Sequence, residues 1–259
     1  MTPKFIGKSA PLSSSGLANV CADLKVKQAE IWAVLHVETS GYGFLSNRQP
    51  KILFERHIFH DETQGRFDSQ PDISNKTPRG YGDGGVHQYE RLAKAIAFDE
   101  QAALRSASWG LGQIMGFNAK AAGSTDVNEM ITKMVESEDN QLLAMAEFLK
   151  NSNGRLDKAL QTHDWETFAQ GYNGANFKQN KYDEKLQAAF AQFSVLLPDL
   201  NVRTAQVFLT YLGYHPGTID GVMGQRTQSA LEEFQQQERL PVTGAPDPGT
   251  IERLTTKVG

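Results

Sequence analysis

Apolar residues between positions 26 and 37 recur at the spacing of an α-helix. One stripe runs from Val26 through Ala29 and Ala33 to Val37, and apolar residues between these positions widen it to most of the circumference. Such a pattern predicts a helix that is buried on nearly all sides. The helix is expected to end at Ser40-Gly41-Tyr42-Gly43, because two glycines there provide a stop signal.

The remaining pattern up to residue 198 predicts a mainly α domain with a small β element. Residues 9–16 are expected to form a loop leading into the first helix, and Ile52 with Phe54 predicts a short strand. A glycine-rich loop is expected over residues 79–85, without the Gly-Lys-Ser/Thr ending of a phosphate-binding loop. Further helical patterns lie over residues 87–105, 126–151, 155–162, 164–171 and 180–196.

A break at Leu197-Pro198-Asp199 marks the expected domain boundary. The residues that follow contain three shorter amphipathic patterns separated by glycine turns; these patterns run over residues 202–212, over residues 224–239 and from residue 250 onward. Three short helices around a compact core can fold as an independent module. The sequence therefore predicts one domain over residues 1–198 and a small three-helix module over residues 199–259.

Composition and charge narrow the class of protein. The chain has 259 residues, of which 39% are hydrophobic and 22% charged, which excludes collagen-like and disordered proteins. Its 26 basic and 30 acidic residues give a net charge of −4, so binding to nucleic acid through phosphate neutralisation is not expected. The single cysteine, Cys21, cannot form an internal disulfide and is expected to be a small core residue.

Neither a membrane span nor a secretory signal is visible in the sequence. No segment approaches the roughly 18–20 apolar residues that cross a bilayer, and the first residues carry positive charge without an apolar stretch. We therefore expect the protein to be made in a cytoplasm and to stay there until another factor releases it.

Glu38 is the first candidate for catalysis. It stands near the end of the predicted buried helix, four residues after Val34, and therefore projects from the apolar side. Burial and the negative end of the helix dipole both raise the pKa of a carboxyl group in this position. A carboxylic acid that stays protonated near neutral pH can protonate the leaving oxygen of a glycoside. On position alone, a glutamate that simply reaches solvent is the alternative.

Two further motifs combine glycines with amide and aromatic side chains. In the segment SWGLGQIMG, from Ser108 to Gly116, glycines let a ligand approach the backbone and Gln113 can hydrogen-bond to a sugar. In Gly171-Tyr172-Asn173-Gly174 the ring can stack on a pyranose while the amide binds it. Taken alone, the first motif also fits a tight helix–helix contact, and the second fits a helix C-cap.

In order, Glu38-Thr-Ser-Gly, Gly110-Leu-Gly-Gln-Ile-Met and Tyr172-Asn-Gly resemble the three motifs of the goose-type lysozyme and soluble lytic transglycosylase superfamily. A strand-like segment over residues 51–57, which follows the helix and its glycine turn, makes the chain most similar to the N-acetylmuramidases of phage endolysins. The resemblance covers about residues 15–196.

Two departures favour the muramidases over the transglycosylases: Thr39 stands where a serine is usual, and Gly171 stands where an alanine is usual. The resemblance implies a lysozyme-like fold with Glu38 as the acid. It also implies that Ser108, Gln113, Tyr172 and Asn173 bind the substrate.

Glu55 is the natural second carboxylate, since the resemblance places its strand beside the catalytic cleft. An inverting glycosidase needs a base about 6.5–9.5 Å from the acid, with a water molecule between them. The alternative is that Glu55 pairs with Arg56 or another basic group and orients the strand. Strand alternation places Glu55 on the same face as Leu53 and opposite Phe54.

The sequence lacks the residues needed for metal-dependent or serine-hydrolase catalysis. His57 and His60 have no companion metal ligands, and neither a His-Glu-x-x-His nor a Gly-x-Ser-x-Gly motif occurs in the sequence. We expect neither a metal nor another cofactor.

The C-terminal segment closely resembles the three-helix peptidoglycan-binding domain that is attached to many cell-wall hydrolases. The matching motifs are Gly217-x-Ile219-Asp220-Gly221, Gly224-x-x-Thr227-x-x-Ala230-Leu231 and Leu240-x-x-Thr243-Gly244. The resemblance implies wall binding without locating the groove, and the candidate lining groups are Tyr214, Asp220 and Arg226.

These features together predict a modular bacteriolytic enzyme that cleaves the β-1,4 bond between N-acetylmuramic acid and N-acetylglucosamine. A phage or prophage endolysin that is monomeric and released by a separate holin-like partner is expected; an effector delivered by a secretion machine would look the same. The rival functions are a lytic transglycosylase, which forms 1,6-anhydromuramoyl ends, and a non-enzymatic wall-binding protein. Truncation after Pro198 is expected to leave a folded muramidase with weaker wall binding.

Overall fold

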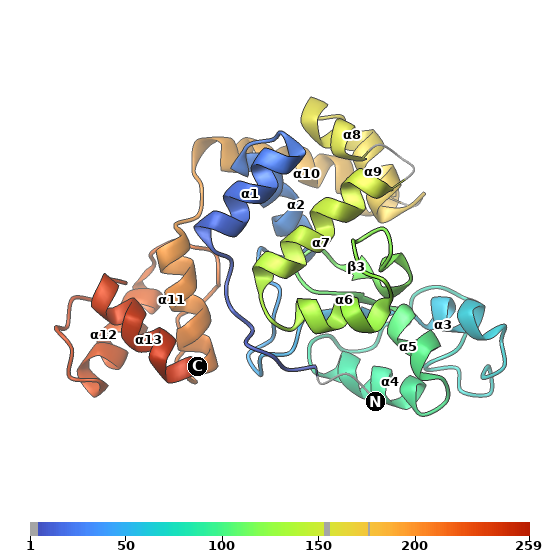
Figure 1. Cartoon of the computed structure of the whole chain (residues 1–259), viewed down its shortest axis with the longest axis horizontal. Coiled ribbons are helices and arrows are strands. Elements are labelled where there is room, and N and C mark those ends of the chain that lie inside the picture. The colour runs from blue at the N-terminus through green and yellow to red at the C-terminus, as the bar shows by residue number, and fades with distance from the viewer. Residues whose placement is uncertain (1–4, 153–155, 176) are drawn as a thin grey trace.

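The computed structural model describes residues 5–152, 156–175 and 177–259. Over these residues the chain is mainly helical and divides into a larger N-terminal unit, which contains one small sheet, and a module of three C-terminal helices (Figure 1). The predicted fold class, a mainly α domain with a small β element and a three-helix module, is confirmed. None of the described helices combines the length and apolar composition needed to cross a bilayer.

Ten helices surround the core of the larger unit. They are α1 (Ser14–Leu24), α2 (Gln28–Thr39), α3 (Arg56–Thr63), α4 (His87–Ile96), α5 (Glu100–Arg105), α6 (Val127–Met134), α7 (Glu138–Asn151), α8 (Leu156–Thr162), α9 (Trp165–Asn173) and α10 (Tyr182–Val195). Helix α2 packs mainly against α10, and its residues 31–35 are almost completely buried, as the apolar pattern predicts. It ends at Thr39, with Ser40 in the left-handed conformation.

Three strands form an antiparallel sheet in the order β1 (Ile52–Phe54), β2 (Ala107–Trp109), β3 (Ile114–Met115). The predicted strand is β1, but β2 and β3 are not predicted. Leu53 pairs with Ser108 across the first ladder, and this register brings the SWGLGQIMG segment beside β1. The turn between β2 and β3 requires Gly110, which has a φ of 67° and packs against the side chain of Gln141.

Capping side chains explain where the helix predictions were wrong. Helix α1 begins inside the segment expected to be a loop, because the Ser13 side chain accepts the backbone N–H of Gly16. Asp99 and Ser137 cap α5 and α7 in the same way and divide the helices predicted over residues 87–105 and 126–151. Helix α3 was not predicted, and residue 155 of a predicted helix lies outside the described residues.

The C-terminal module consists of α11 (Leu200–Tyr211), α12 (Gln225–Gln237) and α13 (Pro248–Val258), as predicted. Two buried glutamines hold its turns. The Oε1 atom of Gln206 accepts the backbone N–H groups of Asp220 and Gly221, and Oε1 of Gln235 accepts those of Thr243 and Gly244. The glycine motifs of this module therefore form turns around buried amide groups.

A buried ion pair joins the module to the larger unit. Arg203 on α11 donates to both carboxylate oxygens of Glu138 on α7 at 2.7 and 2.8 Å, and the two residues are 1% and 0% exposed. The Arg203 guanidinium also donates to the carbonyl oxygen of Gly41, just beyond α2. Tyr42 and Phe44 from the larger unit pack within the apolar core of the module. The two units thus share a buried interface.

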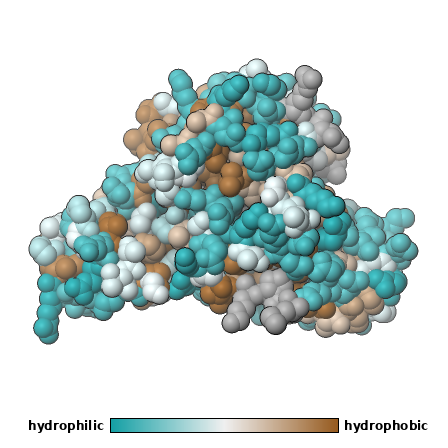
Figure 2. All heavy atoms as spheres, in the orientation of Figure 1, coloured by the Kyte–Doolittle hydropathy of each residue, from teal (hydrophilic) through white to brown (hydrophobic). Residues whose placement is uncertain are grey.

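The visible face of the molecule is mostly hydrophilic, with apolar patches scattered over it (Figure 2). The most exposed apolar side chains at the link between the units are Val195, Leu196 and Leu197.

Candidate active site

A cleft of about 660 Å³ opens between the sheet, the C-terminal end of α2 and the helices α9 and α10. All six residues predicted to catalyse the reaction or bind the substrate line this cleft, although they come from four different segments: Glu38, Glu55, Ser108, Gln113, Tyr172 and Asn173. The fold thus brings together residues that lie up to 135 positions apart in the sequence.

Glu38 lies in the last turn of α2 and is half-buried. Burial raises the pKa of its carboxyl group to about 7, against a smaller opposing effect of the hydrogen bond from Asn173. That bond, from Nδ2 of Asn173 to Oε1 of Glu38, is 2.8 Å long. A substantial fraction of Glu38 is therefore protonated at neutral pH, which is the state required of a general acid.

The end of α2 is tied to the sheet by two contacts next to Glu38. The Thr39 hydroxyl donates to the carbonyl oxygen of Leu111 at 3.0 Å, and Nζ of Lys51 donates to the carbonyl oxygen of Thr39 at 2.8 Å. These contacts satisfy backbone groups at the helix end and fix the direction in which Glu38 leaves the helix. Thr39, which departs from the superfamily motif, thus keeps a hydroxyl at this position.

Glu55 follows β1 directly and precedes the first turn of α3. As the alternation predicts, Leu53 and Glu55 line the cleft while Phe54 is fully buried on the other face. Burial raises the pKa of Glu55 to about 7, although a hydrogen bond from Tyr81 and the charge of Arg91 oppose the shift.

The basic group closest to Glu55 is His57, whose Nδ1 lies 3.2 Å from Oε2 of Glu55. Arg56, which the sequence suggested as an ion-pair partner of Glu55, instead donates to the carbonyl oxygen of Pro71. Glu55 therefore sits in the cleft with a raised pKa and without an arginine on its carboxylate among the contacts of the described residues.

The other predicted binding groups are held by internal hydrogen bonds. The Ser108 hydroxyl donates to Oε1 of Gln113 at 2.9 Å, and Nε2 of Gln113 donates to the Gly110 carbonyl oxygen at 2.8 Å. Tyr172 stacks on Phe168 and donates its hydroxyl to the carbonyl oxygen of Gly112. These side chains shape the wall of the cleft as well as lining it.

Asn173 carries an unused hydrogen-bond acceptor in the cleft. Its Nδ2 is used by Glu38, while its Oδ1 is buried and has no hydrogen-bond partner within the described part of the chain. A buried acceptor without a partner costs free energy, which a donor group on a bound sugar would recover.

Tyr182 is a cleft residue that the sequence analysis missed. It is the first residue of α10, and its pKa is raised by burial and then by the charges of Glu38 and Glu55. Tyr182 therefore lines the same cleft as Glu38 and Glu55, and its hydroxyl is sensitive to the charge of both. The only sequence signal is an aromatic residue shortly after the Tyr172-Asn173 motif.

Of the residues predicted to bind the wall, Tyr214 and Arg226 line one groove of the C-terminal module. Asp220 does not line it. Its Oδ1 accepts the backbone N–H of Val222 at 2.9 Å and an N–H of Gln206 at 3.2 Å, so it holds a turn. Within the described residues, no group of three His, Cys, Asp or Glu side chains is arranged to hold a metal ion.

Comparisons with known proteins identify both parts of the chain. A family model described as N-acetylmuramidase matches residues 27–194, and one described as "Putative peptidoglycan binding domain" matches residues 198–254. Among solved structures, the crystal structure of the Burkholderia AP3 phage endolysin is similar, with 37% sequence identity and a TM-score of 0.63. The match covers 71% of this chain and 70% of that one. No curated protein matches the chain.

Proposed function

The chain belongs to the N-acetylmuramidase family, and we propose that it acts as an endolysin that hydrolyses the β-1,4 bond between N-acetylmuramic acid and N-acetylglucosamine in peptidoglycan. The observation that carries the proposal is the half-buried Glu38, whose pKa is raised to about 7 in a cleft that also holds Glu55. This pairing of carboxyl groups suits acid–base cleavage of a glycoside.

In the proposed mechanism Glu38 donates its proton to the glycosidic oxygen as the bond to the anomeric carbon breaks. Glu55, in its ionised form, accepts a proton from the water that attacks this carbon. Asn173 holds the Glu38 carboxyl through Nδ2 and binds the sugar through its free Oδ1. Tyr182, which lines the same cleft, binds substrate hydroxyls.

The products distinguish hydrolysis from transglycosylation. We expect mass spectrometry of purified peptidoglycan digested by the protein to show muropeptides with free reducing ends, because water is the attacking group. Muropeptides that end in 1,6-anhydromuramic acid would instead identify a lytic transglycosylase.

The pH dependence follows from the two raised pKa values. Glu38 must be protonated to act as the acid, so activity falls as the pH rises above about 7; Glu55 must be ionised to act as the base, so activity falls below about 7. We expect a narrow bell-shaped profile of kcat/KM centred near pH 7, with apparent pKa values that belong to the pair. A profile that is flat from pH 5 to 9 would contradict these roles.

Glu55→Gln separates the two roles that the sequence leaves open for Glu55. If Glu55 is the base, the variant keeps the wild-type melting temperature and substrate affinity but loses turnover by about 10²–10⁴-fold. If it only anchors a basic partner, the variant melts earlier and retains turnover while folded. Measuring both quantities on one sample decides between them, and wild-type values for both would refute either role.

For the C-terminal module we propose wall binding, supported by the match of residues 198–254. We also propose that the protein acts as a monomer and reaches the wall through a separate membrane-permeabilising partner. Co-expression with a pore-forming protein tests the second point: lysis is expected only when both are present.

A further inference from the structure

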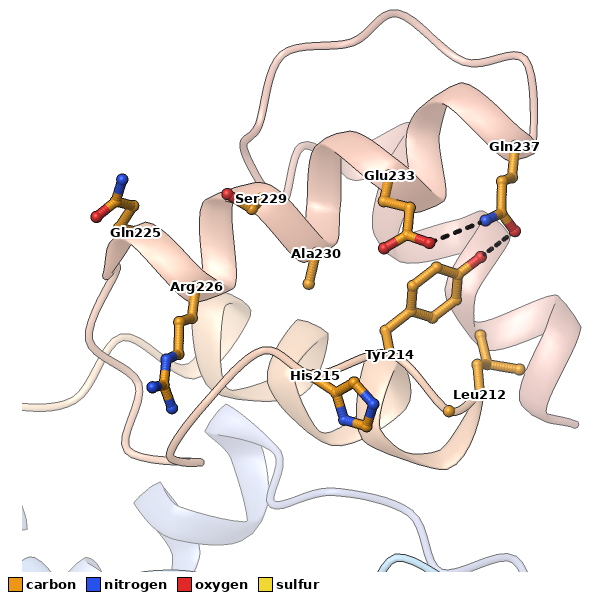
Figure 3. A pocket seen from close by; sticks show the side chains of 10 residues that line it. Leu212, Tyr214, His215, Gln225, Arg226, Ser229, Ala230, Glu233 and Gln237 are labelled. Carbon is orange, nitrogen blue, oxygen red and sulfur yellow. Dashed lines mark hydrogen bonds between the residues drawn. The ribbon is translucent and has the colours of Figure 1, made fainter.

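A polar groove of about 690 Å³ runs along α12 in the C-terminal module. One wall is α12 itself, and the other is the segment over residues 212–215 that follows α11 (Figure 3). The groove is separate from the catalytic cleft, because the two cavities have no lining residue in common.

Opposite charges stand at the two ends of this groove. Arg226 and Glu233 both lie on α12, two helical turns apart, which corresponds to about 10 Å along the helix axis. Figure 3 shows Arg226 near one end and Glu233 near the other, with the short side chains of Ser229 and Ala230 between them. The groove is thus lined by short side chains in the middle and by charged side chains at both ends.

Hydrogen bonds hold the side chains at the acidic end of the groove in place before any ligand binds. Nε2 of Gln237 donates to Oε1 of Glu233 at 3.2 Å, and the Tyr214 hydroxyl donates to Oε1 of Gln237 at 2.7 Å. The Tyr214 ring also packs edge-on against the buried Phe234. The Glu233 carboxylate and the Tyr214 ring therefore hold their positions without a ligand, which lowers the entropic cost of binding one.

The guanidinium of Arg226, at the other end, makes no ion pair or side-chain hydrogen bond within the described residues. A guanidinium that is free of protein partners and borders a groove can pair with a ligand carboxylate through two parallel hydrogen bonds. His215 lies along the same wall, beside Tyr214 (Figure 3).

A ligand that satisfies both ends must carry a carboxylate and an ammonium group. The residues that bear the two charges of the groove are about 10 Å apart along the helix axis, a distance that about three residues of an extended peptide span at about 3.3 Å each. The N-acetylated sugars of the glycan strand carry no ammonium group and would leave Glu233 unmatched. The peptide stems of peptidoglycan carry free carboxylates, and a diamino acid in a stem keeps its side-chain ammonium until cross-linking acylates it.

We propose that this groove binds the stem peptide of peptidoglycan, with Arg226 on a stem carboxylate, Glu233 on the free ammonium of the diamino acid, and Tyr214 against the chain between them. This inference rests on the proposed function for its target, the cell wall. It also implies a preference for stems that are not cross-linked, since acylation removes the cation that Glu233 recognises.

The test is an NMR titration of the full chain carrying Glu38→Gln, which prevents digestion of the ligand. The probe is a soluble disaccharide–tetrapeptide whose stem contains diaminopimelic acid, and the comparison ligand is a peptide-free oligosaccharide of N-acetylglucosamine. We expect shifts at Tyr214 and along α12 with the stem-bearing probe only. N-acetylation of the diaminopimelate amine should weaken binding by at least about threefold, the scale of an exposed charge pair.

Matched variants locate the two charges. Arg226→Gln and Glu233→Gln should each weaken binding of the stem-bearing probe by about three- to fivefold. Glu252→Gln, at an exposed residue of α13 outside the groove, should leave binding unchanged. Because Glu233 recognises the amine, Glu233→Gln should also abolish the difference between the free and N-acetylated probes, which a general loss of stability would not do.

Shifts that map to the catalytic cleft alone, or equal binding of both ligands at the groove, would overturn the proposal. These outcomes are separable from failure of the muramidase function. Release of reducing ends by the wild-type chain without stem binding at the groove would refute this inference alone. Stem binding without any release of reducing ends would refute the muramidase proposal alone.

Discussion

Glu38→Gln is expected to fold normally and to lose muramidase activity by about 10²–10⁴-fold, the usual contribution of a general acid. The amide has the size of the carboxyl group, and its Oε1 can accept the same hydrogen bond from Asn173 that the carboxyl accepts at 2.8 Å. It has no proton to transfer to the leaving oxygen. The measurement is release of reducing ends from purified peptidoglycan, alongside circular dichroism and the melting temperature.

A second glutamate provides the control for Glu38. Glu252 is an exposed residue on the last helix, away from the cleft, and Glu252→Gln should keep both rate and stability. We also expect the Glu38→Gln chain to melt no earlier than the wild type, since a buried ionisable carboxyl is replaced by a neutral group. A folded Glu38→Gln enzyme with wild-type activity would remove Glu38 from the mechanism.

The sequence predicts many of the residues that line the candidate cleft, because their positions have local signals. The apolar stripe fixes the face of α2, and the glycine stop fixes its end, so the position of Glu38 follows. Strand alternation likewise predicts the face on which Glu55 lies. The pKa of Glu38, raised by burial to about 7, has the direction that these local arguments give.

What the sequence could not predict depends on contacts between distant segments. Strands β2 and β3 are three and two residues long; β2 pairs with β1, which lies more than 50 positions away in the sequence, and β3 pairs with β2. The hydrogen bond from Asn173 to Glu38 joins α9 to α2, and Tyr182 reaches the cleft because α10 packs against α2. No local propensity encodes these arrangements.

The domain boundary near Pro198 is the prediction most affected by such contacts. Arg203 lies beyond the boundary, yet its guanidinium is buried in the larger unit against Glu138 and the Gly41 carbonyl oxygen. We propose that this boundary separates two functions but not two independently stable folds. A chain truncated after Pro198 loses the cation that neutralises Glu138.

Among mutations at the interface, those that break the buried Arg203–Glu138 pair should therefore change the free energy of unfolding most. Arg203→Met is expected to lower the free energy of unfolding by about 3–5 kcal/mol, because it leaves a buried carboxylate without its partner. Within the described residues, Glu138 then keeps two donors, the backbone N–H groups of Leu12 and Gly43. Urea denaturation of the full-length chain measures the change.

The matched control is Arg253→Met, which removes an arginine from an exposed ion pair with Glu238 and should cost no more than about 1 kcal/mol. Combining Arg203→Met with Glu138→Gln should recover part of the lost stability, since the uncompensated charge disappears while the amide oxygen still accepts a backbone N–H. The same Glu138→Gln change should stabilise the chain truncated after Pro198. If Arg203→Met and Arg253→Met cost the same, the wall-binding module does not complete the fold of the catalytic unit, and truncation should leave a muramidase as stable as the intact chain.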